Sequence, residues 1–112
     1  MIEKVILDYL SAELPVTVFM ERPDLSQHAN FVLFEKTGSG RSNRLESSTF
    51  AFQSWADSLY QAAALNDEVK MAVDNLVTLD EIGSVRLNSD YNYTDTNTRK
   101  YRYQAVYDIS HY

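Results

Sequence analysis

The sequence predicts one α+β domain over residues 1–112, with two helices packed on one face of an antiparallel sheet of about five strands. Two segments carry apolar residues at three- and four-residue intervals, which is typical of amphipathic helices. Five shorter segments are apolar throughout or alternate between apolar and polar, which is typical of strands. Their order is α-β-β-β-α-β-β, and the short turns between successive strands favour antiparallel hairpins.

The first helix is predicted over residues 2–14. Its apolar positions lie on one stripe and comprise Ile2, Val5, Ile6, Tyr9, Leu10 and Leu14. Pro15 ends this helix, because proline lacks the backbone N–H and restricts the residue before it. Residues 16–21 are then expected to form a short strand, with Pro23 in the turn beyond it.

The middle of the chain predicts a long hairpin. Residues 31–34 are consecutively apolar, so we expect the strand over 30–37 to be central and covered on both faces. Residues 37–46 read TGSGRSNRLE and hold two of the three glycines, which indicates a long flexible loop. In the next strand, 47–56, Phe50 and Phe52 are expected on one face and Thr49, Ala51, Gln53 and Trp55 on the other.

The last third of the chain predicts a helix followed by two strands. Residues 58–76 have helical periodicity, and Ser58 and Gln61 have the spacing of a capping box. Alternation then predicts strands over 85–93, with Val85, Leu87, Ser89, Tyr91 and Tyr93 on one face, and over 101–110. The sheet face opposite the helices is expected to carry Tyr, Phe, Gln and Trp, which suit an interface.

Charge and composition exclude several classes of protein. The chain has 16 acidic and 10 basic residues, so its net charge of −6 disfavours nonspecific DNA binding. The absence of cysteine excludes disulfides, a thiolate nucleophile and a cysteine-based zinc site. Glu3 and Asp8 interrupt the apolar start, which argues against a signal peptide, and no apolar run is long enough to enter a membrane.

The sequence predicts no enzyme, no cofactor and no metal site. His28 and His111 lack metal-ligand spacing, and both are expected at the surface. No Gly-x-Ser-x-Gly motif occurs, and residues 38–42 lack the spacing of a phosphate-binding loop. The neighbouring carboxylates at 67–68 and 80–81 do not converge on a helix and are expected in solvent. No catalytic residue is therefore predicted.

Tyrosine is concentrated at the end of the chain. Six of the eight tyrosines lie in residues 91–112, interleaved with Arg99, Lys100 and Arg102. Such a pattern is compatible with stacking of single-stranded RNA, with packing of a β-hairpin, or with packing combined with a subunit contact. The acidic net charge argues against RNA, so packing combined with a subunit contact is favoured.

Several segments resemble one family. The run FVLFEKTGSGRSNRLESSTFAFQSWA at 31–56, the helix after it and the terminal strand YRYQAVYDIS resemble the tail-terminator or tail-completion proteins of long-tailed phages and prophages. The closest matches are Glu35-Lys36-Thr37-Gly38 and Gln53-Ser54-Trp55-Ala56. The resemblance extends over most of the chain. It implies a virion protein, present in the host cytoplasm during assembly, that forms a ring, commonly hexameric, caps the tail tube and docks on the head connector.

A ring requires two different contact patches on each subunit. We expect a subunit interface with one patch at Tyr101, Tyr103 and Tyr107 and the other at Thr49, Gln53 and Trp55. The partner-docking loop comprises Gly38, Ser39, Gly40, Arg41 and Arg44, and is expected to reach the tail tube or the connector. DNA would only pass through an acidic lumen.

Other interpretations stay open at this point. An isolated subunit can be monomeric, because a ring completed only on the tail tube needs a modest interface. The alternatives are a related head-tail neck or connector protein, and a small module that binds single-stranded RNA through the C-terminal Tyr/Arg hairpin. A small enzyme would need a site formed between subunits.

Overall fold

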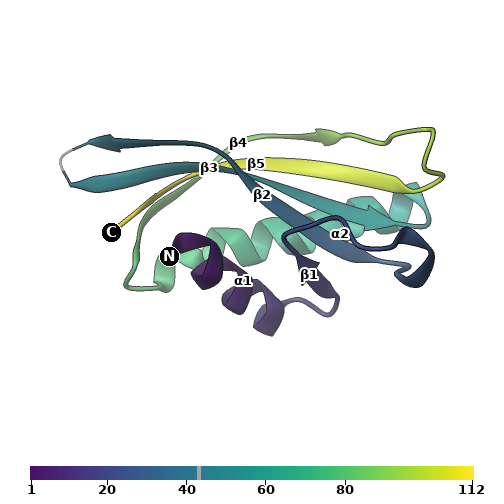
Figure 1. Ribbon diagram of the computed structural model, residues 1–112, viewed down its shortest axis with the longest axis horizontal. Helices are drawn as coiled ribbons and strands as arrows, with labels where there is room; N and C mark the ends of the chain where they lie inside the picture. Colours follow the sequence, from purple (N-terminus) through teal and green to yellow (C-terminus); the bar gives the residue numbers. More distant parts are fainter. Residues whose placement is uncertain (43) are drawn as a thin grey trace.

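The computed structural model describes residues 1–42 and 44–112 and confirms the predicted α+β class and element order (Figure 1). The molecule is elongated, with principal extents of 44 × 24 × 21 Å. Its helices and strands are α1 (Ile2–Glu13), β1 (Thr17–Phe19), β2 (Phe31–Ser42), β3 (Leu45–Ala56), α2 (Leu59–Asp74), β4 (Ile82–Asn92) and β5 (Tyr101–His111). Single 3-10 turns occur at Leu25–Gln27 and Asn75–Thr78.

The five strands form one sheet in the order β1-β2-β3-β5-β4. The prediction of a wholly antiparallel sheet is wrong at one edge, because β1 pairs with β2 in parallel. The eleven residues between β1 and β2 carry the chain back along the sheet, which a tight hairpin turn cannot do. The central strand is β3 rather than β2, because β5 pairs with its second edge.

Both helices cover the same face of the sheet, as predicted (Figure 1). The core lies between them and the sheet, and its largest members from the strands are Val32, Phe34, Phe50, Phe52, Tyr107 and Ile109. The helices contribute Ile6, Leu10, Val69, Val73 and Leu76. Helix α2 begins at the predicted cap, where the backbone N–H of Gln61 donates to Ser58 Oγ at 3.1 Å.

The segment predicted as a long loop at 37–46 is mostly strand. β2 and β3 pair as far as Ser42 and Leu45, Arg44 lies in the turn, and residue 43 lies outside the described residues. Neither glycine in this segment has a positive φ, whereas Arg44 does, at 69°. The local preference of glycine for loops is therefore outweighed by backbone pairing between the two strands.

A β-bulge changes which face the end of β4 presents. The predicted alternation over 85–93 breaks between Leu87 and Ser89, where the register with β5 shifts. Leu87 pairs with Tyr107 on the helix-covered side, whereas Tyr91 pairs with Gln104 on the opposite side. One inserted residue moves all later side chains to the other face, so the prediction that Leu87 and Tyr91 share a face is wrong.

Candidate functional site: the uncovered sheet face and the projecting hairpin

The sheet face opposite α1 and α2, called the uncovered face below, carries a network of polar and aromatic side chains. Gln53 Nε2 donates to Gln104 Oε1 at 2.8 Å, and Gln104 Nε2 donates to the Tyr91 hydroxyl at 2.6 Å. The indole N–H of Trp55 donates to Gln53 Oε1 at 3.1 Å. These bonds join β3, β5 and β4. The face carries Tyr, Phe, Gln and Trp as predicted, but Gln53 and Trp55 are buried in contacts within the chain.

Trp55 is buried within the protomer. Its ring stacks on Phe31 at a centroid distance of 5.4 Å and an interplanar angle of 15°. The guanidinium of Arg102 lies 4.8 Å from the Trp55 ring centroid and 4.5 Å from that of Tyr93, and Arg22 lies 5.5 Å from Trp55. Only 1% of Trp55 is exposed, so this side chain has little surface left for the predicted subunit contact.

Asp108 organises the end of the uncovered face nearer the hairpin. Its carboxylate accepts hydrogen bonds from Asn88 Nδ2 at 3.2 Å and from Thr49 Oγ1 at 2.8 Å. These two bonds, with a smaller contribution from Arg86, hold the pKa of Asp108 below its usual value. Thr49, predicted as part of a subunit patch, is therefore half-buried and bonded within the chain.

We expect Asp108→Asn to lower the free energy of unfolding at pH 7 by about 1 kcal/mol. Because the folded pKa is lowered, the stabilisation is present above the ordinary carboxyl pKa and is lost as the pH falls through the folded pKa. Urea unfolding at pH 7 and pH 3 should show wild type and variant converging in acid. The control is Asp80→Asn, because Asp80 is exposed. If the free energies of unfolding of wild type and Asp108→Asn differed equally at both pH values, the charge of Asp108 would not be the source of the stabilisation.

The tyrosines of the predicted subunit patch lie on the helix-covered side of β5 and differ in burial. Tyr107 is 1% exposed, and its hydroxyl donates to Asp74 Oδ1 at 2.9 Å. Burial and the neighbouring Asp74 carboxylate raise the pKa of Tyr107 well above its ordinary value. Tyr103 is half-buried and Tyr101 is exposed. The contact therefore stays a prediction that involves Tyr101 and Tyr103, because Tyr107 reaches no surface.

Two of the three basic residues of the C-terminal hairpin, Lys100 and Arg102, have partners inside the chain, and Arg99 is exposed. Lys100 is 9% exposed, and its Nζ donates to Asp57 Oδ1 at 2.6 Å and to the Ala29 carbonyl at 3.0 Å. Arg102 lies between two aromatic rings, and its Nε donates to the Tyr93 carbonyl. This arrangement does not favour RNA, because phosphates would have to compete with these internal contacts.

The two histidines differ in environment. His28 is half-buried, and its ring centroid lies 5.0 Å from that of Phe19. His111 is buried, and its Nε2 shares a hydrogen bond with Ser48 Oγ at 2.9 Å. The prediction that His111 is at the surface is wrong, because β5 extends to this residue. The alternation of Tyr107, Ile109 and His111 is the sequence signal that identifies its inward position.

The described residues offer little for small-molecule chemistry. A cavity of about 580 Å³ is lined by residues 25–29, Asp57 and 98–100. Its inner cation, Lys100, is already paired with Asp57. Residues 1–42 and 44–112 contain no group of three or more His, Asp or Glu side chains placed to hold a metal ion. Within the same residues, neither helix is long and apolar enough to cross a membrane.

The most prominent surface feature is the far end of the β2–β3 hairpin, residues 36–48 without 43, called the projecting hairpin below (Figure 1). Every residue from 35 to 42 is exposed. Arg41 and Glu46 form a cross-strand ion pair at 2.7 Å, which leaves the Arg41 side chain 74% exposed. The predicted docking residues lie on this element: Gly38, Ser39, Gly40, Arg41 and Arg44.

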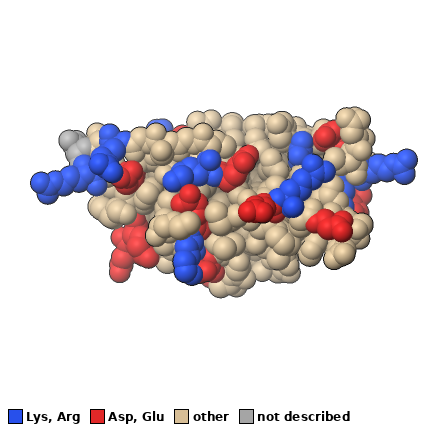
Figure 2. Space-filling view, viewed as in Figure 1, with Lys and Arg blue, Asp and Glu red and all other residues tan. Residues whose placement is uncertain are grey.

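Charge is unevenly distributed along the long axis. Figure 2 shows basic side chains projecting at both ends of the molecule, with acidic and further basic side chains intermixed between them. The projecting hairpin occupies one of these ends (Figure 1). No family model and no curated protein matches the chain.

Proposed function

We propose that this chain is a structural subunit of a phage or prophage virion. Copies form a ring that caps the tail tube and joins it to the head connector. The projecting hairpin is the observation that supports this proposal most. β3 of this hairpin pairs with β5 along Glu46–Ala56, which holds the hairpin in the sheet, whereas β2 is exposed over residues 35–42 and its outer edge has no described partner strand there. Such an element is suited to docking on another protein.

The rest of the surface is consistent with a role in assembly. The sheet has a second, uncovered face and two unlike edges, and a ring needs two different complementary patches on each subunit. The net charge of −6 suits a lumen through which DNA slides without adhering, because fixed negative charges repel phosphates. Hexameric stoichiometry is part of the proposal and derives from the sequence resemblance.

The proposal is tested by the mass of the protein in solution. Light scattering across protein concentrations, alone and mixed with terminator-deficient tail tubes, should give one discrete multi-subunit species. Negative-stain images should show rings, free or at tube ends. A monomer in both conditions would contradict the proposal. Binding to single-stranded RNA that weakens steeply with salt would favour the RNA-binding alternative instead.

Reversing the charge of the hairpin tip should impair docking. We expect Arg41→Glu combined with Arg44→Glu to weaken attachment to tail tubes at least about tenfold, or roughly 1.4 kcal/mol. Co-sedimentation with tubes measures the effect, and circular dichroism should show an unchanged fold. The matched control is Arg99→Glu, because Arg99 is exposed and has a positive φ like Arg44 but lies in the β4–β5 connection. Equal binding by all three proteins would exclude the tip from docking.

A further inference from the structure

The sheet ends in two long edges to which no described strand pairs. β1 pairs only with Phe31–Leu33, so the outer edge of β2 is open from residue 34 to 42. At the other side of the sheet, β4 pairs with β5 only, which leaves its outer edge open over Ile82–Asn92. Unpaired backbone N–H and C=O groups along an edge are a template for another strand.

The strand directions make these two edges compatible with each other. β2, β3, β5 and β4 are successively antiparallel, so β4 runs opposite to β2. When two copies lie side by side in the same orientation, β4 of one and β2 of the next are therefore antiparallel. Antiparallel ladders are slightly more stable per residue than parallel ones.

The two edges also bend at the same level of the sheet. One row of paired residues crosses all four long strands and comprises Lys36, Phe50, Tyr107 and Leu87. The bulge of β2 begins directly after Lys36, and the second bulge of β4 begins directly after Leu87. Bulges bend a strand and increase its twist. Because both edges bend at the same row, β2 and β4 of neighbouring copies can stay side by side on both sides of the bend.

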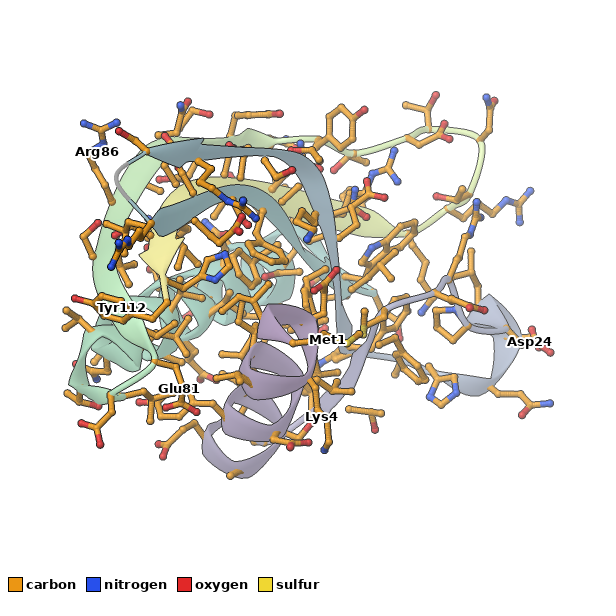
Figure 3. All side chains as sticks on the ribbon, turned by 60° about the vertical axis from the view of Figure 1, so that its left-hand side comes forward. Met1, Lys4, Asp24, Glu81, Arg86 and Tyr112 are labelled. Atoms are coloured by element: carbon orange, nitrogen blue, oxygen red, sulfur yellow. The ribbon has the colours of Figure 1, made fainter. Side chains whose placement is uncertain are left out.

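Opposite charges stand at matching positions of the two edges. Another row of the sheet runs from Arg41 through Glu46 and His111 to Ile82. Exposed Asp80 and Glu81 directly precede Ile82, and the backbone N–H of Tyr112 donates to the Glu81 carbonyl at 3.0 Å, so the ladder continues to this corner. Figure 3 shows Arg86, Tyr112 and Glu81 on the side of the molecule where the hairpin ends. The basic tip of one copy would thus meet the acidic corner of the next.

We propose that copies of this chain join edge to edge, with β4 of one protomer pairing antiparallel with β2 of the next. The inference rests on the proposed ring and names the contact that closes it. The contact is heterologous, because the two edges differ, and such a contact forms a ring when the rotation between subunits closes. Backbone hydrogen bonds provide the pairing, and the Arg41 and Asp80–Glu81 ends set its register.

Cysteine cross-linking tests this contact, because the chain has no cysteine of its own. Gly38 and Arg86 lie in the same row of the sheet, at its two opposite edges. Gly38 pairs with Thr49, Thr49 pairs with Asp108, and Asp108 pairs with Arg86. A side chain at Gly38 meets nothing within 4 Å, and the Arg86 side chain is 81% exposed. Within one protomer these positions are three strand spacings apart, about 14 Å, so a bismaleimide with a reach of about 8 Å links only different copies.

The double variant Gly38→Cys/Arg86→Cys should give a ladder of covalent species larger than a dimer in denaturing electrophoresis. Each single variant should stay monomeric, and an equimolar mixture of the two single variants should stop at the dimer. The linker is long enough to react even if β4 of one copy is offset along the strand direction by about two residues from β2 of the next copy. The control pair is Gly38→Cys/Thr96→Cys, because Thr96 is exposed in the β4–β5 connection, away from the β4 edge, and should give no ladder.

Each contrary result has a distinct meaning when light scattering is done on the same samples. Rings without cross-links overturn the edge contact and leave the proposed ring to another surface. Covalent dimers of a single variant overturn the head-to-tail arrangement, because they indicate two-fold pairing of like edges. Monomers in both measurements overturn the edge contact and self-assembly together.

Discussion

Replacing Trp55 with alanine is expected to lower the free energy of unfolding by about 3–5 kcal/mol. The substitution removes the stacking partner of Phe31 and the ring beneath the Arg102 guanidinium, and leaves a cavity at a position that is 1% exposed. Domains of ordinary size have about 5–15 kcal/mol of stability in total, so the variant should be close to unfolding. Urea unfolding followed by far-ultraviolet circular dichroism measures the loss.

The control is Trp55→Phe, which keeps an aromatic ring against Phe31 but loses the indole hydrogen bond to Gln53. We expect this variant to lose about 1–2 kcal/mol. If Trp55→Ala instead unfolded like the wild type while losing only self-association, Trp55 would be a subunit contact. The two measurements therefore distinguish a core residue from the interface residue that the sequence predicts.

Replacing Tyr107 with alanine should cost about 3–5 kcal/mol, because its ring packs edge-to-face on Phe52 inside the core. Tyr107→Phe retains the ring and loses only the hydrogen bond to Asp74, so about 1 kcal/mol is expected at pH 7. Thermal or urea unfolding of both variants should show this order. Equal losses would mean that the hydroxyl, rather than the ring, provides the stability.

The raised pKa of Tyr107 adds a dependence on alkaline pH. Because the folded pKa exceeds the ordinary tyrosine value of about 10, stabilisation is complete below pH 10 and is lost as the pH rises toward the folded pKa. One pH unit above 10 the loss amounts to about 1.4 kcal/mol, so the advantage of about 1 kcal/mol that wild type has over Tyr107→Phe at pH 7 should disappear or reverse. Tyr101→Phe is the control, because Tyr101 is exposed. A constant difference from pH 8 to 11 would show that Tyr107 does not titrate differently on unfolding.

Local periodicity was sufficient to locate the elements of this protein. The apolar stripe of α1, the Ser58 cap of α2 and the alternation of Phe50 and Phe52 in β3 were all predicted and confirmed. Each depends on residues within one helix or strand, where the side chain repeats every 3.6 or every 2 positions. The α+β class follows from these elements and their order.

The candidate site was predictable only in part. Alternation correctly placed Gln53 and Trp55 on one face of β3, yet it contains no information about which segment covers that face. Arg22 and Arg102 come from distant parts of the chain and shield Trp55. The docking residues around Gly38 and Arg41 were identified as exposed, whereas their strand conformation depends on pairing with residues of β3.

The sequence by itself therefore determined the two helices, the order of the five strands and the buried faces of α1, α2 and β3, because burial of apolar side chains acts through local periodicity. Tertiary structure alone decided the parallel pairing of β1 and the bulges after Lys36 and Leu87. It also decided that β2 and β4 are the two open edges of the sheet. These features depend on which strands meet across long separations in the chain, and a single inserted residue changes the register.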